Sequence, residues 1–151
     1  MGQKPIPFDE YKAIYSKITR LTVDIVIRGK DGVVLLLRKN GGWEGLWHFP
    51  GSMVFFKETL EAAVIRTALE ETGLEVNNLS FLDHMYFPEE EKERGYGYTI
   101  SATFMCDVVS GALKHDEDSS AIQVFKEVPE HIVPEHGDLL RKHWDKIKTA
   151  W

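Results

Sequence analysis

The chain has 151 residues, of which 43% are hydrophobic and 28% charged, and its formal net charge is −6 at pH 7. This balance is typical of one globular domain, so we expect residues 1–151 to form a single domain with residues 1–18 as an N-terminal helical extension. The negative charge argues against nucleic acid or an anionic membrane as a partner, although a bound metal ion can reverse the field locally. No hydrophobic run resembles a membrane span or a signal peptide, and the lone Cys106 fits a reducing compartment, so we expect a cytoplasmic protein.

Helical and strand-like patterns alternate along the chain. They predict a helix at 8–17, strands at 21–28 and 33–37, a helix between the caps Thr59 and Gly73, strands at 79–87, 96–109 and 123–128, and a helix at 139–147. A loop at 88–95 joins the two long strands. Strands with helices before, between and after them predict an α/β fold in which helices cover a mixed β-sheet.

The segment 50–76 carries the most informative residues. Arg66 and Glu70 are one turn apart on the predicted helix, and Glu71 follows directly. Glu58 precedes the helix within reach of Arg66. Adjacent carboxylates repel one another unless a cation or an arginine compensates them, and Mg²⁺ prefers such oxygen ligands. Taken alone, these residues are more typical of a solvated helix face with ordinary ion pairs.

The spacing of these residues resembles the Nudix box, G-x5-E-x7-R-E-U-x-E-E-x-G-U, where U is aliphatic. Laid on this chain, the box begins at Ser52 and keeps every spacing. The residues identical to the box are Glu58, Arg66, Glu70, Glu71 and Gly73. The resemblance implies a Nudix-type α/β/α sandwich with a mixed β-sheet, and a hydrolase as its activity.

The resemblance also implies roles for individual residues. Gly51, through its carbonyl, would bind Mg²⁺ or Mn²⁺ together with Glu70 and Glu71. Glu58 and Arg66 would orient those carboxylates, and all four charged residues would be catalytic. The implied substrate is a small molecule in which a nucleoside diphosphate is linked to another group.

Two residues depart from the box. Ser52 replaces its first glycine, which is compatible with the fold if this position needs no positive φ. Thr67 replaces the glutamate that follows the arginine. Threonine neither binds a metal strongly nor deprotonates water, so we expect a site with fewer metal ions or with a base from elsewhere in the chain.

From Phe8 to about Leu74 the chain is similar to the GDP-mannose mannosyl hydrolases, which also lack that glutamate. This resemblance implies a nucleotide sugar as substrate, with Asp24 and Arg38 at or beside positions that contact it. Trp47 would stack on the substrate or anchor its loop to the core. The family's C-terminal Gln-His pair falls near Ser119, where neither neighbouring serine can replace a histidine as a base.

Several alternatives remain open at this point. The chain is expected to be a Mg²⁺-dependent hydrolase of a nucleotide sugar, a Nudix pyrophosphohydrolase of other nucleotides, or a non-catalytic nucleotide-binding module of the same fold. His48 lies beside a Pro-Gly turn and either faces a ligand or packs in the core. The N-terminal helix could exchange between subunits, which would give a homodimer.

Overall fold

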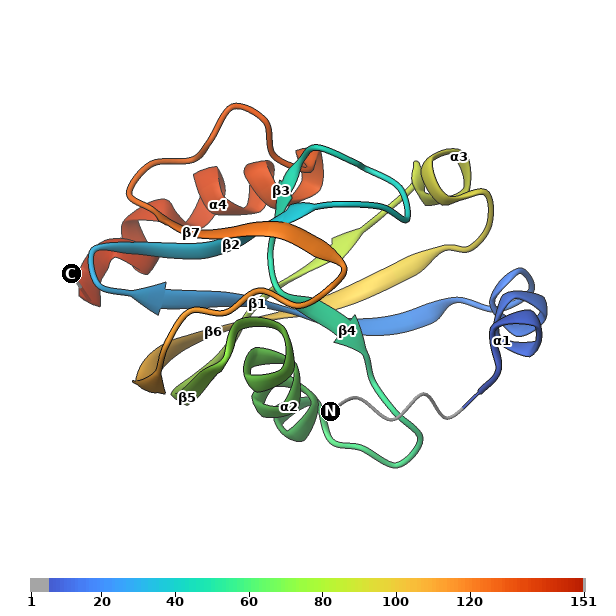
Figure 1. The fold of residues 1–151 in the computed structure, drawn as a ribbon, viewed down its shortest axis with the longest axis horizontal. Coiled ribbons are helices and arrows are strands. Elements are labelled where there is room, and N and C mark those ends of the chain that lie inside the picture. The colour runs from blue at the N-terminus through green and yellow to red at the C-terminus, as the bar shows by residue number, and fades with distance from the viewer. Residues whose placement is uncertain (1–5, 151) are drawn as a thin grey trace.

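The computed structural model describes residues 6–150, so residues 1–5 of the expected N-terminal extension and residue 151 lie outside the described part. The strands are β1 (Arg20–Gly29), β2 (Gly32–Arg38), β3 (Trp47–His48), β4 (Gly51–Met53), β5 (Leu74–Tyr86), β6 (Thr99–Gly111) and β7 (Ser119–Phe125). The helices are α1 (Phe8–Tyr15), α2 (Leu60–Thr72), α3 (Glu90–Arg94), α4 (Pro134–Ile147) and the 3-10 turn η1 (Lys148–Ala150). Helices α2 and α4 lie on opposite sides of the sheet (Figure 1). The predicted α/β sandwich is confirmed, and the sheet is mixed because β1 and β6 are parallel while the other pairs are antiparallel.

Several predicted boundaries were wrong. Strand β5 begins at Leu74, and β7 begins at Ser119, because pairing with β6 and with β2 extends both strands through polar residues. The predicted loop at 88–95 contains the short helix α3, which Gly95 ends in the left-handed conformation at φ 96°. Helix α4 begins at Pro134, whose missing N–H has no partner to lose in the first turn of a helix.

The hairpin of β1 and β2 is paired only at its closed end. Its register pairs Arg28 with Val33 and Gly29 with Gly32. Beyond that point β1 pairs with β4 and β6, whereas β2 pairs with β3 and β7. The two strands therefore diverge, and the cavity described below lies where they have separated.

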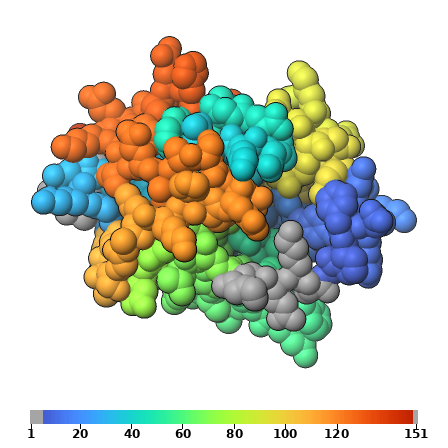
Figure 2. Space-filling model, viewed as in Figure 1, coloured from blue at the N-terminus to red at the C-terminus, as the bar shows by residue number. Residues whose placement is uncertain are grey.

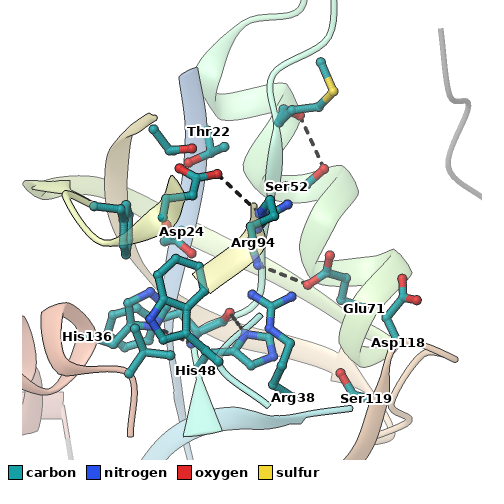
Figure 3. A pocket seen from close by; sticks show the side chains of 18 of the residues that line it. Thr22, Asp24, Arg38, His48, Ser52, Glu71, Arg94, Asp118, Ser119 and His136 are labelled. Carbon is teal, nitrogen blue, oxygen red and sulfur yellow. Dashed lines mark hydrogen bonds and ion pairs between the residues drawn. The ribbon is translucent and has the colours of Figure 1, made fainter. Parts of the chain in front are cut away.

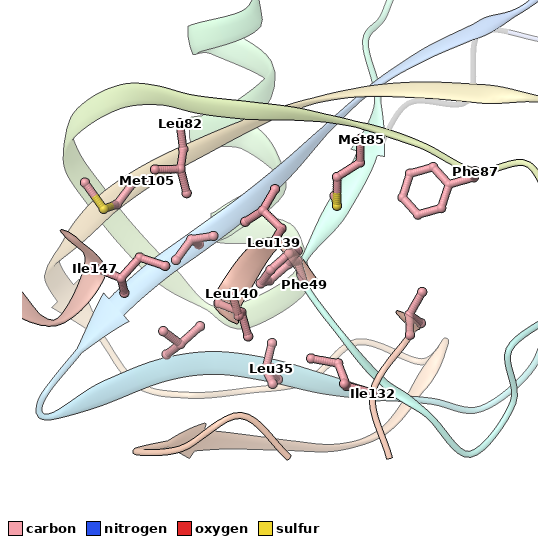
Figure 4. Close-up of a cluster of buried hydrophobic side chains, with 13 residues drawn as sticks. Leu35, Phe49, Leu82, Met85, Phe87, Met105, Ile132, Leu139, Leu140 and Ile147 are labelled. Carbon is pink, nitrogen blue, oxygen red and sulfur yellow. The ribbon is translucent and has the colours of Figure 1, made fainter. Parts of the chain in front are cut away.

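Two hydrophobic clusters hold the layers together. The cluster beneath α4 includes Leu35 of β2, Phe49 and Leu140, all with 1% exposure or less (Figure 4). The cluster beneath α2 includes Ile25 and Val64, both fully buried. Fully burying such a side chain stabilises the fold by roughly 1.5–3 kcal/mol, so these clusters fix both helices against the sheet.

Helix α2 begins and ends as predicted. Thr59 Oγ1 accepts a hydrogen bond from the Ala62 N–H at 3.1 Å, and Gly73 closes the helix at φ 76°. A Cβ at Gly73 would lie 2.7 Å from the Ala112 carbonyl oxygen, so the loop after β6 packs directly on this cap. The Lys114 N–H also donates to the Thr72 carbonyl at 2.9 Å. The end of α2 and the loop between β6 and β7 are therefore fastened together.

Helices α1 and α3 lie side by side at one end of the molecule (Figures 1 and 2). Arg20 joins them, because its guanidinium donates to the Tyr11 hydroxyl and to Glu90 Oε2, the latter at 3.0 Å. Glu90 is 2% exposed although it is charged. Within residues 6–150, no helix is long and apolar enough to cross a membrane.

Candidate active site

Three of the predicted site residues form one ion-pair cluster at α2. Arg66 donates through Nε to Glu58 Oε2 at 2.7 Å, through Nη2 to Glu58 Oε1 at 2.8 Å and through Nη1 to Glu70 Oε1 at 3.0 Å. The guanidinium lies 3.8 Å from the centre of the Phe55 ring. These bonds lower the pKa of Glu58 and raise the pKa of Arg66, since each stabilises the charged form of its partner. We call Glu58, Arg66 and Glu70 the ion-pair cluster.

Ser52 fits its position in β4 without strain. It has no positive φ, unlike Lys57 in the loop that follows. Its Oγ lies 3.4 Å from Arg66 Nη1, and Arg66 Nη2 donates to the Met53 carbonyl at 3.0 Å. The ion-pair cluster is thereby connected to β4 as well as to α2.

A cavity of about 230 Å³ opens between the diverging strands and the loop after β6 (Figure 3). Of the predicted site residues, it contains Asp24, Arg38, Gly51 and Glu71. The other residues that line it include Trp43, His48, Phe87, Glu90, Arg94, Asp116, Asp118 and His136. The described residues of its lining do not include those of the ion-pair cluster, so the structure divides the predicted site in two.

The carboxylates of Glu71 and Asp24 share the cavity. The Gly51 N–H donates to Glu71 Oε1 at 3.0 Å, and Ser101 Oγ donates to Asp24 Oδ2. Desolvation raises the pKa of Glu71 to about 8, with further contributions from Asp116 and Asp24. Desolvation likewise raises the pKa of Asp24 to about 6. A Cβ at Gly51 would lie 2.2 Å from Asp24 Oδ1, so only glycine fits between these groups.

Arg38 faces these carboxylates from the end of β2. Desolvation and the nearby charge of Arg94 lower its pKa, while Glu71 and Asp24 act in the opposite direction. Within the described part of the chain, its Nε has no hydrogen-bond partner. Arg38, whose Nε has no hydrogen-bond partner among the described residues, thus shares the cavity with the carboxylates of Glu71 and Asp24.

A hard divalent cation suits the chemistry of this carboxylate group. Desolvation, and then the charges of Asp116 and Asp24, raise the pKa of Glu71, and a bound cation would stabilise its charged form. Among residues 6–150, no three side chains of the metal-binding types converge into a ready-made site. This arrangement fits Mg²⁺, which commonly takes one or two carboxylates and completes its shell with water and phosphate oxygens.

Thr67 does not face the cavity. It is fully buried on the core side of α2, and its Oγ1 has no hydrogen-bond partner among the described residues. A glutamate in this conformation would place its charge in the core, so the threonine belongs to the packing of α2 in this chain. Any base must therefore come from another element.

Trp43, in the loop before β3, and Trp47, the first residue of β3, have different surroundings. Trp47 packs against Phe125, with ring centroids 4.6 Å apart, and its backbone bonds to His131 and Val133. The described lining of the cavity includes Trp43 but not Trp47. The structure thus places Trp47 as a core anchor, which was one of its two expected roles.

Sequence reasoning missed several cavity residues. Asp116 and Asp118 precede β7 in an acidic run, and this run was the available signal. Glu90, Arg94 and His136 come from helices far away in sequence, and no spacing in the chain connects them to the box. Desolvation and the neighbouring Asp118 raise the pKa of Asp116.

Comparisons with known proteins agree with this geometry. The NUDIX domain family matches residues 18–146. The low-salt glycan biosynthesis protein Agl8 of Haloferax volcanii is 33% identical over 132 residues, which cover 85% of each protein. An ADP-ribose pyrophosphatase of Methanocaldococcus jannaschii is 34% identical over 105 residues, or 70% of this chain and 60% of that protein. The crystal structure of a MutT Nudix hydrolase from Burkholderia pseudomallei has the same fold, with a TM-score of 0.74 at 20% identity over 83% of this chain and 98% of the other. The chain therefore belongs to the Nudix hydrolase family.

Proposed function

We propose that this protein hydrolyses a nucleotide sugar, with Mg²⁺ or Mn²⁺ as cofactor. The observation that carries the proposal is the arrangement of Arg38 opposite Glu71 and Asp24 in one cavity. A diphosphate would bring negative charge to Arg38 and, through a shared cation, to the carboxylates. In the complex, Arg38 would pair with the diphosphate, and the carboxylates would pair with the cation.

Glu71 and the Gly51 carbonyl are the proposed protein ligands of the metal ion. When bound, the ion draws charge from the diphosphate and makes water more acidic. Glu70 was expected to be a ligand too, but its Oε1 is bonded to Arg66 at 3.0 Å. We assign Glu70, Glu58 and Arg66 to holding α2 and β4 in place, so that Glu71 meets Gly51 at the correct distance.

Asp116 is the proposed general base in place of the glutamate that Thr67 replaces. It lies in the loop after β6 and lines the cavity near Glu71. Its raised pKa makes it a better proton acceptor than an ordinary aspartate, because a carboxylate of higher pKa binds a proton more strongly. In this role Asp116 takes the proton of the water that attacks the substrate.

The sugar nucleotide is favoured over other diphosphates by two observations. Besides its charged residues, the cavity is lined by neutral polar and aromatic groups, among them Trp43 and His136, which suit a hydroxyl-bearing ring. The relative from Haloferax volcanii is named for glycan biosynthesis. The second candidate is a pyrophosphohydrolase of an ADP-ribose type of substrate, which the relative from Methanocaldococcus jannaschii favours.

A panel of nucleotide sugars, ADP-ribose and free nucleotides, with Mg²⁺ or Mn²⁺, tests the proposal by measuring nucleotide release. We expect the highest kcat/KM for a nucleotide sugar. A higher value for ADP-ribose would support the second candidate. Calorimetric binding without turnover of any compound would indicate a binding module. Running the best reaction in ¹⁸O-labelled water then locates the attack, at phosphorus if the phosphate product is labelled and at carbon if the sugar is.

A further inference from the structure

The backbone of Phe49 fixes the tautomers of two buried histidines. His48 Nδ1 lies 2.6 Å from the Phe49 carbonyl oxygen, which can only accept, so this nitrogen carries the proton. The Phe49 N–H donates to His136 Nδ1 at 3.0 Å, so that nitrogen carries none. The proton of His48 is therefore on Nδ1, and the proton of neutral His136 is on Nε2.

Both imidazole rings are held in place. The Phe49 ring stacks on His136 with centroids 4.5 Å apart and an interplanar angle of 13°. The centroids of the two histidines are 6.5 Å apart. His48 is 7% exposed and His136 is 5% exposed, and both line the cavity (Figure 3). The pair is a rigid part of the cavity wall.

One atom of this pair lacks a partner. Among the described residues, no group hydrogen-bonds to the buried Nε2 of His48. Leaving a buried acceptor unpaired is unfavourable, so a donor supplied by a ligand would be bound favourably there. His48 thus has an unpaired acceptor at Nε2 and neutral His136 has a proton at Nε2, and both residues line the cavity.

Both histidines are neutral at neutral pH. Desolvation and then the charge of Arg38 lower the pKa of His48 to about 3. Desolvation, His48 and Arg38 lower the pKa of His136 well below its ordinary value. Neutral rings with such weak basicity suit hydrogen bonding to an uncharged group better than proton transfer.

We propose that His48 and His136 determine substrate specificity by binding a hydroxyl group of the moiety that is attached to the diphosphate. A hydroxyl can donate to His48 Nε2 and accept from His136 Nε2, which are the two functions that the wall offers. Arg38 and both histidines line the same cavity, so this hydroxyl belongs to the part of the substrate that shares the cavity with the diphosphate. This inference rests on the proposed function, and it deepens it by naming the residues that read the sugar.

The hydroxyl can come from the glycosyl group or from the ribose of the nucleoside. Deoxy analogues distinguish these sources. Each hydroxyl next to the diphosphate is removed in turn, first from the sugar and then from the ribose, and kcat/KM is measured for every pair of compounds. We expect wild-type protein to prefer the hydroxyl-bearing compound at least about tenfold for one glycosyl position, because the unpaired site penalises its absence. A preference confined to a ribose hydroxyl would overturn the glycosyl assignment.

Three variants connect that preference to the histidines. His48→Phe keeps a ring but removes the acceptor, and we expect its preference to fall to about twofold or less. His48→Gln supplies an acceptor again and should recover part of the preference. His131→Phe changes an exposed histidine that does not line the cavity, and it serves as the matched control.

Each outcome bears on one proposal. If His48→Phe lowers kcat/KM equally for both members of the pair, the histidine has only a structural role and the inference is wrong. If wild-type protein hydrolyses ADP-ribose but no nucleotide sugar, the proposed function fails instead. The role of the histidines is then tested on deoxy analogues of ADP-ribose. If His48→Phe still prefers the hydroxyl-bearing compound as strongly as wild-type protein does, the inference is wrong. If nothing turns over, calorimetric Kd values for the same pairs provide the comparison.

Discussion

Glu70 and Glu71 are neighbours in sequence but belong to opposite electrostatic environments. Glu70 is bonded to Arg66 at 3.0 Å within the ion-pair cluster, whose arginine also holds both carboxylate oxygens of Glu58. Glu71 enters the cavity, where it accepts a hydrogen bond from the Gly51 N–H. Desolvation raises its pKa to about 8, and the nearby carboxylates of Asp116 and Asp24 add to this rise.

The ion-pair cluster therefore has a structural role, whereas Glu71 belongs to the part of the site that we propose binds the metal ion. Charges in the ion-pair cluster compensate one another, so they stabilise one arrangement of α2 and β4. Arg38 compensates the cavity carboxylates only in part, and desolvation still raises the pKa of Asp24 and of Glu71, so a bound cation would stabilise their charged forms. A helix can present both kinds of carboxylate at successive positions because each residue turns by about 100° around its axis.

The largest expected effect comes from Glu71→Gln. The change removes the proposed metal ligand but keeps the shape of the side chain, so metal-dependent kcat/KM should fall at least ~100-fold. The free energy of unfolding in metal-free buffer above pH 8 should stay constant or rise, because a desolvated charge is lost. Glu61→Gln, on the exposed face of α2, is the matched control. Wild-type rates in Glu71→Gln would show that the metal assignment is wrong.

Asp116→Asn tests the proposed general base, which lines the cavity together with Glu71. Losing a positioned base should lower kcat by about 10²–10⁴-fold while the affinity for Mn²⁺ changes little. Asp118→Asn, in the same loop but exposed, should have a smaller effect. Equal losses in both variants would mean that the loop contributes its charge and not a specific proton acceptor.

Arg66→Met tests the ion-pair cluster. The methionine fills part of the space but leaves Glu58 and Glu70 without their shared cation, and we expect a loss of about 2–3 kcal/mol in the free energy of unfolding. Chemical denaturation measures this loss. The double variant Glu58→Gln with Arg66→Met should recover part of it. If Arg66→Met keeps its stability and loses only activity, the ion-pair cluster does not hold α2 and β4 in place.

The smallest expected effect is the change in the free energy of unfolding with pH. Asp24 and Glu71 have ordinary pKa values of 3.8 and 4.5, which the fold raises to about 6 and about 8. The folded state therefore holds more protons than the unfolded state between these values, and the free energy of unfolding falls as the pH rises through this window. Thermal unfolding without metal should show this fall. Added Mg²⁺ should raise Tm more at pH 8 than at pH 6, and an equal rise at both values would contradict the raised pKa of Glu71.

The sequence was a good guide wherever local spacing decides the structure. Thr59 and Gly73 cap α2 as expected, and the three- and four-residue spacings bring Arg66 to Glu70. Local patterns could not show that Thr67 turns to the core, because this depends on how α2 packs on the sheet. Nor could they show which tryptophan faces the cavity. Trp43 adopts a left-handed conformation at φ 51°, which is rare for a tryptophan and has no signal in composition.

Residues placed by long-range contacts were the hardest to foresee. Asp116 reaches Glu71 because Lys114 is bonded to Thr72 across more than forty positions of the chain. His136 reaches the cavity because α4 begins at Pro134 and because the Phe49 backbone binds its ring. Such placements arise from the packing of distant segments, and no single stretch of sequence contains them.

The partial pairing of β1 with β2 divides the sheet into two halves on either side of the cavity. Asp24 and Gly51 belong to the half-sheet of β1, β4, β6 and β5, whereas Arg38 belongs to the half formed by β2, β3 and β7. The halves share the ladder from Arg28 to Val33 at the closed end of the hairpin. The cation and the carboxylates are therefore supplied by different halves of one sheet, and the point where the hairpin ladder ends sets how far apart the two halves hold them.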